Sequence, residues 1–157
     1  MEETRFNIVL VEPEIPPNTG RLCLATGSTL NLVKPLGFSL EDRQLKRAGL
    51  DYWHEVDVKM WDSLSVFMKS NEGSGSRFLV TTKAARPYWD VKFQPGDFLV
   101  FGRETKGLPE SLLREHPESC ITIPMQSTRN LNLATAVAII LFEAVRQQQH
   151  SEGDGVE

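Results

Sequence analysis

The strongest structural signal in the chain lies at residues 98–109, which run Phe98-Leu99-Val100-Phe101-Gly102-Arg103-Glu104-Thr105-Lys106-Gly107-Leu108-Pro109. An unbroken apolar run such as 98–101 is typical of a central strand in a parallel sheet, which is covered on both faces. Gly102 and Gly107 then bracket a charged turn, where glycine permits positive φ and lets a ligand approach the backbone closely. The turn is not a phosphate-binding Walker loop, because no Gly-Lys-Ser/Thr follows, and its glycine spacing alone also suits a simple turn.

Short apolar runs that end in turn residues recur on both sides of this segment, and helical stretches separate them. The runs predict strands at about 8–11, 32–35, 56–59, 78–82 and 121–124. The stretches between them predict helices at about 21–28, 41–48, 63–70, 110–114 and 130–148. Because strands and helices alternate, the sequence predicts an α/β fold with a mostly parallel sheet flanked by helices.

The length of 157 residues predicts one domain, since about 100–200 residues per domain is usual. A hydrophobic share of 40% and a charged share of 24% are ordinary for a globular chain. We expect the domain to span residues 1–150 and the acidic residues 151–157 to form a frayed tail. The formal net charge of −4 disfavours a broad basic face for nucleic acid, so a nucleic-acid-binding chain would have to concentrate its positive charge locally.

Targeting and membrane segments are not expected. Residues 1–5 lack the basic and apolar regions of a signal peptide, and the longest apolar run, 136–142, is far shorter than the about 20 residues of a membrane span. We therefore expect a cytoplasmic protein, and an organellar location stays open. Cys23 and Cys120 have no Cys or His at metal-ligand spacing, so we expect no metal site and two reduced thiols, with a disulfide as the alternative.

The expected helix at 130–148 is apolar around nearly its whole circumference. A helix of that kind must be buried on all sides. A terminal helix in a domain this small rarely achieves such burial within one chain. We therefore expect this helix to form a homodimer interface, and a deep groove within one chain is the alternative.

Three segments lie at or just after the expected carboxyl ends of strands, and ligands bind outside those ends in open α/β sheets. The segments are 16–21 (Pro-Pro-Asn-Thr-Gly-Arg), 102–109, and 123–132 (Ile-Pro-Met-Gln-Ser-Thr-Arg-Asn-Leu-Asn). Asn130 suits the N-cap of the long helix, whereas Asn132 has less local justification. Arg129 is placed to hold a phosphate at the positive end of that helix. A dinucleotide site and a hydrolase triad are disfavoured, because neither glycine fingerprint nor nucleophile-elbow serine is present.

Taken together and in this order, the segments resemble the SPOUT class of RNA 2′-O-methyltransferases. With the run Ala48-Gly49-Leu50-Asp51-Tyr52-Trp53 they are most similar to the tRNA (cytidine/uridine-2′-O-)-methyltransferases of the wobble position. The similarity extends over about residues 6–148. It implies a C-terminal trefoil knot, a homodimer, tRNA as substrate, and S-adenosylmethionine as methyl donor without a metal.

The resemblance also assigns site residues. Backbone groups of three loops contact the cofactor's adenine in this family, and the matching positions here are Val80, Thr81, Gly102, Glu104, Gly107, Ile123, Met125, Asn130 and Leu131. The matching catalytic positions are Arg21, Asn18 and Asn132. We expect Asn132 and Arg129 to position the nucleotide and Glu104 to fix the second loop. Candidates for contact with RNA phosphates are Lys46, Arg47, Lys83, Arg86 and Arg129, for which scattered surface charge is the alternative.

One departure from the family bears on catalysis. In the family three residues, an Asn and two apolar ones, separate the Asn-Thr-Gly run from the arginine, whereas Arg21 follows Gly20 directly here. Three fewer helical residues shorten a helix by about 4.5 Å. The alternative function is therefore a noncatalytic RNA-binding module of the same fold, disabled by the shortened first motif. An unrelated small-molecule binder with a doubly wound sheet is a third possibility.

Overall fold

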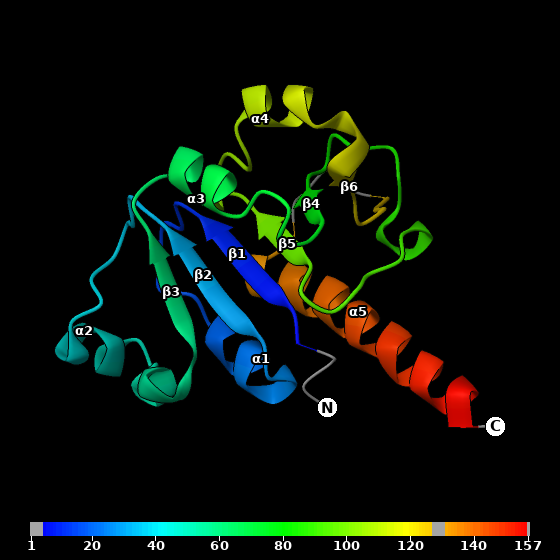
Figure 1. Ribbon diagram of the computed structural model, residues 1–157. Helices are drawn as coiled ribbons and strands as arrows, with labels where there is room; N and C mark the ends of the chain where they lie inside the picture. The colour runs from blue at the N-terminus through cyan, green and yellow to red at the C-terminus, as the bar shows by residue number, and fades with distance from the viewer. Residues whose placement is uncertain (1–4, 127–130, 157) are drawn as a thin grey trace.

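The computed structural model of the chain describes residues 5–126 and 131–156. One six-stranded sheet, in which every neighbouring pair is parallel, forms its centre in the order β3-β2-β1-β5-β4-β6 (Figure 1). The strands are β1 (Asn7–Val11), β2 (Thr29–Val33), β3 (Val58–Trp61), β4 (Arg77–Val80), β5 (Phe98–Phe101) and β6 (Cys120–Ile121). The predicted α/β fold with a mostly parallel sheet is confirmed.

Helices lie between the strands and after β6. They are α1 (Thr19–Thr26), α2 (Asp42–Arg47), α3 (Leu64–Ser70), α4 (Glu110–Glu115) and α5 (Leu133–Val156). The described residues also form three short 3₁₀ helices, η2 (Asp51–Glu55), η3 (Tyr88–Asp90) and η4 (Pro117–Ser119), which the sequence did not predict. The second strand lies earlier than the expected 32–35, because Pro35 has no N–H for the ladder, whereas Thr29 N donates to Phe6 O at 3.0 Å.

Strand β5 has the position that its apolar run predicted, since all four of its residues are buried. Its side chains alternate between two cores. Leu99 and Phe101 join the core beneath α1 and α5, and Phe98 and Val100 join the core beneath α3 and α4. The two pairs of helices cover opposite faces of the sheet (Figure 1). Covering both faces is what a parallel sheet requires.

Helix α5 buries only one side against the sheet. Val137, Ile140, Leu141 and Ala144 are completely buried, whereas Phe142 is 45% exposed. The helix is assigned to Val156, and the domain boundary at 150 with a frayed tail after it stays a prediction. Extending an existing helix adds a hydrogen bond without a new nucleus. The knot expected in the C-terminal third of the chain stays a prediction, because residues 127–130 of that third lie outside the described residues.

The topology creates a crevice between β1 and β5. These strands are neighbours, but the chain leaves β1 toward β2 on one side and leaves β5 toward the β4–β6 side on the other. Ligands bind in open α/β sheets at such a point, outside the carboxyl ends of the strands. The loops after β1 and β5 therefore meet where a binding site is expected.

Neither cysteine forms a disulfide. Cys23 of α1 is buried in the core, and its burial raises the pKa of its thiol to about 12, whereas Cys120 of β6 is half-buried. No helix among the described residues is long and apolar enough to cross a membrane.

We predict that Leu99→Ala lowers the free energy of unfolding by about 2–5 kcal/mol, because Leu99 is completely buried in the central strand. Urea unfolding followed by circular dichroism measures this loss. The control is Val66→Ala on α3, where the side chain is 45% exposed and a change within about 0.5 kcal/mol is expected. Equal destabilisation by the two variants would contradict the assignment of β5 to the centre of the core.

Candidate functional site

A pocket of about 410 Å³ opens at the carboxyl ends of β4, β5 and β6, beside the first turn of α5. Its wall comes from the loops after these strands, with Ile15 from the loop after β1. The pocket brings together every described residue that the sequence predicted for the cofactor, and Asn132 as well. These residues are Val80, Thr81, Gly102, Glu104, Gly107, Ile123, Met125 and Leu131. Asn130 lies outside the described residues.

The loop after β5 is closed by contacts between backbone atoms. Arg103 N donates to Gly107 O at 3.2 Å, and Gly107 N donates to Arg103 O at 2.8 Å. Gly107 has φ of +69°, and a Cβ on Gly102 would lie 2.1 Å from the carbonyl carbon of Gly107. The two glycines are therefore needed for the turn itself. As a result, the loop presents a narrow backbone edge to the pocket.

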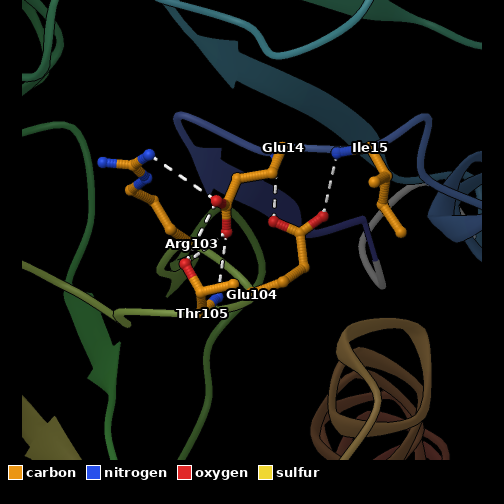
Figure 2. Close-up of polar contacts among 5 residues, drawn as sticks. All are labelled: Glu14, Ile15, Arg103, Glu104 and Thr105. Carbon is orange, nitrogen blue, oxygen red and sulfur yellow. Dashed lines mark hydrogen bonds and ion pairs between the residues drawn. The ribbon is translucent and has the colours of Figure 1, made fainter.

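A carboxylate of this loop holds the loop after β1. Glu104 Oε1 accepts a hydrogen bond from Glu14 N at 2.9 Å, and Glu104 Oε2 accepts one from Ile15 N at 3.2 Å (Figure 2). Both oxygens are thus bonded to consecutive backbone N–H groups. The contact ties the loops after β1 and β5 together across the crevice, as a loop-fixing role for Glu104 requires.

Glu14 makes the reciprocal contact. Its Oε1 accepts hydrogen bonds from the backbone N and the hydroxyl of Thr105, both at 2.9 Å, and the hydroxyl also lies 3.1 Å from Oε2 (Figure 2). The backbone bond from Thr105, its hydroxyl, and the positive charges of Arg103 and Lys106 together lower the pKa of Glu14. We call the two crossed carboxylates, Glu14 and Glu104, the carboxylate clasp. The sequence did not single out Glu14, because its proximity to Arg103 and Lys106 of the other loop is visible only in the structure.

Basic side chains give the pocket a positive character. Arg103 and Lys106 lie in its wall, and Lys83 lies there too, paired with Glu110 of α4. Arg103 Nη2 is 3.6 Å from Glu14 Oε2 (Figure 2). The Nε of Arg103 is buried and has no hydrogen-bond partner among the described residues. A pocket with apolar and cationic walls suits a ligand that combines an apolar body with a negative charge.

Asn132 caps helix α5. Its Oδ1 accepts hydrogen bonds from Ala134 N at 2.9 Å and from Thr135 N at 3.4 Å. The sequence had favoured Asn130 as the cap, but the described part of α5 begins at Leu133, which puts Asn132 in the capping position. Arg129, predicted to hold a phosphate here, lies outside the described residues.

Arg21 and Asn18 do not line the pocket of their own chain. Asn18 precedes α1 and makes no capping bond with its side chain. Arg21 lies in the first turn of α1, where its guanidinium carbon is 4.4 Å from the ring centre of Tyr52 in η2. Because α1 already begins at Thr19, Arg21 projects over η2 rather than toward the loops after β4, β5 and β6. Within one chain the structure does not bring Arg21 and Asn18 together with Asn132, and their catalytic role stays a prediction.

The predicted RNA-binding residues are divided between the two edges of the sheet. Lys46 and Arg47 are exposed on α2, beside the β3 edge, whereas Arg86 lies beside β6, where its carbonyl accepts from Thr122 N at 2.9 Å (Figure 1). Arg86 also lines a neighbouring pocket of about 730 Å³ against α4. One chain does not bring these residues together. The residues that the structure describes contain no group of three metal-ligating side chains.

The chain is similar to known proteins over most of its length. Residues 5–142 match the model of the SpoU rRNA Methylase family. A tRNA (cytidine(34)-2′-O)-methyltransferase from Methylovorus glucosotrophus is 48% identical over 147 residues, which cover 90% of this chain and 95% of the relative. A structure solved to study the 2-OH methylation of C/U34 on tRNA superposes with a TM-score of 0.87 at 38% identity, covering 96% of this chain and 99% of that one.

A more distant neighbour agrees in fold alone. The methyltransferase AviRb from Streptomyces viridochromogenes, solved in complex with the cofactor AdoMet, has a TM-score of 0.78 at 23% identity. The match covers 94% of this chain and 62% of that chain. It shows that the arrangement of the sheet and its helices is shared.

We predict that Gly102→Ala lowers the free energy of unfolding by about 3 kcal/mol or more, because the added Cβ meets backbone atoms that cannot rotate away. The control is Gly49→Ala, where φ is +77° and nothing lies within 4 Å, so that only the left-handed strain of about 1–2 kcal/mol applies. Chemical denaturation measures both. If Gly102→Ala were no worse than Gly49→Ala, the backbone contact would not hold the loop.

We predict that Glu14→Gln destabilises the protein at neutral pH and that this effect disappears in acid. The pKa of Glu14 is lowered in the folded state, so its carboxylate stabilises the folded protein at pH values above the carboxyl's ordinary pKa. This contribution is lost as the pH falls through the folded-state pKa. The measurement is the thermal midpoint of both proteins from about pH 7 to about pH 3.5. The exposed Glu72→Gln serves as control. A difference that stays constant across this range would show that the charge of Glu14 contributes nothing.

Proposed function

The chain belongs to the SpoU methylase family, and from this premise we propose that it methylates the 2′-hydroxyl of a tRNA ribose, at the wobble cytidine or uridine. The methyl donor is S-adenosylmethionine. The observation that carries the proposal is the convergence of the loops after β4, β5 and β6 on one pocket. The near full-length similarity to tRNA (cytidine(34)-2′-O)-methyltransferases supports the substrate.

The residues of the pocket fit this cofactor. Its volume of about 410 Å³ lies within the roughly 300–1,000 Å³ usual for small-molecule sites. Val80, Ile123 and Leu131 offer apolar wall for an adenosine, and the narrow turn from Gly102 to Gly107 leaves backbone groups close to it. When bound, S-adenosylmethionine supplies an electrophilic methyl group on a sulfonium.

The protein contributes mainly position. Holding the reacting groups in line converts a bimolecular step into a unimolecular one, which is a large part of the rate in such a transfer. The carboxylate clasp fixes the loop after β5, and Asn132 lies at the start of α5, in the pocket wall. Asn132 and the neighbouring Arg129 position the nucleotide. The transfer would need no metal, because the sulfonium sulfur leaves with the electron pair of its bond to the methyl carbon, and the proton of the 2′-hydroxyl is lost as the new O–C bond forms.

A second copy of the chain completes the site in this proposal. Helix α1 packs beside α5 (Figure 1), and the two helices expose Leu24 and Phe142. We infer that these exposed apolar side chains pack against a second copy of the chain in a homodimer through α5. Arg21, on the same helix as Leu24, then lies at the edge of the interface and acts with Asn18 in the partner's site. The dimer also supplies two sets of Lys46, Arg47 and Arg86 to the RNA.

One observation favours the noncatalytic alternative. Arg21 is the residue that the shortened first motif displaces, and its guanidinium rests on Tyr52. If that stack persists in the dimer, the chain binds tRNA and cofactor without transferring the methyl group.

We predict that the protein transfers labelled methyl groups to the 2′-oxygen of one nucleotide in bulk tRNA, and that Arg21→Ala with Asn132→Ala lowers the rate by roughly 100-fold or more through lost positioning. Nuclease digestion of the product identifies the nucleotide. Asn132→Asp keeps the helix cap, so it separates capping from positioning. The exposed Lys59→Ala on β3 is the control.

Two outcomes of this assay decide between the alternatives. Methyl transfer that survives the double substitution would refute the assignment of Arg21 and Asn132. Wild-type protein that binds tRNA and S-adenosylhomocysteine without methyl transfer would establish the noncatalytic module.

A further inference from the structure

The pocket contains a cation that the proposed site does not use. Arg103 is the only arginine in the described part of its wall. Lys83, also in the wall, is paired with Glu110, and both oxygens of Glu104 accept backbone N–H groups. Of the cations in the wall, Arg103 is the one with a buried N–H that has no hydrogen-bond partner among the described residues.

The one carboxylate near Arg103 is already occupied. Glu14 Oε2 lies 3.6 Å from Nη2 of Arg103, but the Glu14 carboxylate already accepts the single hydroxyl proton of Thr105, which lies near both oxygens, and the backbone N–H of Thr105 (Figure 2). That separation is longer than a charge-assisted hydrogen bond, which is about 2.7–2.9 Å. Glu14 therefore orients the guanidinium of Arg103 without saturating it.

The unused donors of Arg103 include a buried one. A guanidinium carries five N–H donors in a fixed fork, and the Nε–H of Arg103 is buried without a partner among the described residues. Leaving such a donor unpaired opposes folding. A ligand that supplies an acceptor at this place would remove the penalty, and the fork matches the planar pair of oxygens of a carboxylate or phosphate.

We propose that Arg103 binds an oxyanion of the ligand that occupies the pocket. The inference rests on the proposed function, which supplies two sources of that chemistry: the carboxylate of the cofactor's amino-acid moiety and a phosphate of the RNA. The cofactor carboxylate is the better match, because Arg103 belongs to the loop that forms the pocket wall.

The test compares two probes by calorimetric titration of the full chain. S-adenosylhomocysteine carries the carboxylate, and 5′-methylthioadenosine has the same adenosine and thioether sulfur without the amino-acid group. Arg103→Gln is expected to lower the affinity for S-adenosylhomocysteine by about 10-fold or more, which corresponds to the loss of one charge-assisted hydrogen bond. Its affinity for 5′-methylthioadenosine should stay within about 2-fold of the wild type. Arg103→Lys keeps the charge and loses the fork, so an intermediate loss is expected.

The matched control is Arg114→Gln on α4, which removes an exposed arginine that pairs with Glu110 and does not line this pocket. This variant should bind both probes as the wild type does. A second titration of each variant with tRNA examines the other source. If the oxyanion is a phosphate, Arg103→Gln keeps its affinity for S-adenosylhomocysteine, weakens tRNA by about 10-fold, and lowers the salt dependence of tRNA binding by about one charge.

Two results would refute the role of Arg103, and a third would refute the proposed function. Arg103→Gln that matches Arg114→Gln with every ligand refutes the role of Arg103. Arg103→Gln that weakens both probes equally shows that the loss does not depend on the carboxylate, which also refutes the role of Arg103. Wild-type protein that binds neither probe refutes the proposed function itself, which distinguishes that failure from the failure of this inference.

Discussion

The site depends on the crossed contact between the loops after β1 and β5. Glu104 holds consecutive backbone N–H groups of the first loop, and Glu14 holds the backbone and hydroxyl of Thr105 in the second. Each carboxylate thereby satisfies donors that neither the sheet nor a helix can reach. Since β1 and β5 are adjacent where their connections diverge, the clasp closes the crevice that the topology leaves open and gives the pocket one fixed wall.

The architecture could be predicted from the sequence because its signals are local. The apolar run 98–101 is buried on both faces, as its composition indicated. Local signals were weaker at the ends of elements. The second strand begins earlier than expected, because Pro35 cannot donate to the sheet. No local pattern predicted the 3₁₀ helix at Asp51–Glu55, where Trp53 is buried against the core and its backbone N donates to Leu50 O at 3.0 Å.

Only part of the site could be predicted, because local sequence patterns do not show which side chains of distant loops make contact. Loops that follow neighbouring parallel strands must meet, so Gly102, Ile123 and Leu131 line one pocket. The clasp joins Glu14 to Thr105, which are 91 positions apart, and no local pattern indicates which side chains bridge two loops. The position of Arg21 depends on where α1 begins and on the contact with the ring of Tyr52. Both are set by tertiary packing, which the local sequence does not reveal.

The overall charge of −4 is compatible with a polyanionic substrate once its distribution is considered. Acidic groups at the pocket are engaged: Glu104 with backbone N–H groups, Glu14 with Thr105. Hydrogen bonds lower the pKa of Glu14, so it stays ionised, yet its charge is partly balanced by the donors around it. The nearby cations of the loop keep free N–H groups for a ligand. Local satisfaction of the carboxylates, rather than an excess of basic residues, is what makes this end of the sheet suited to an anion.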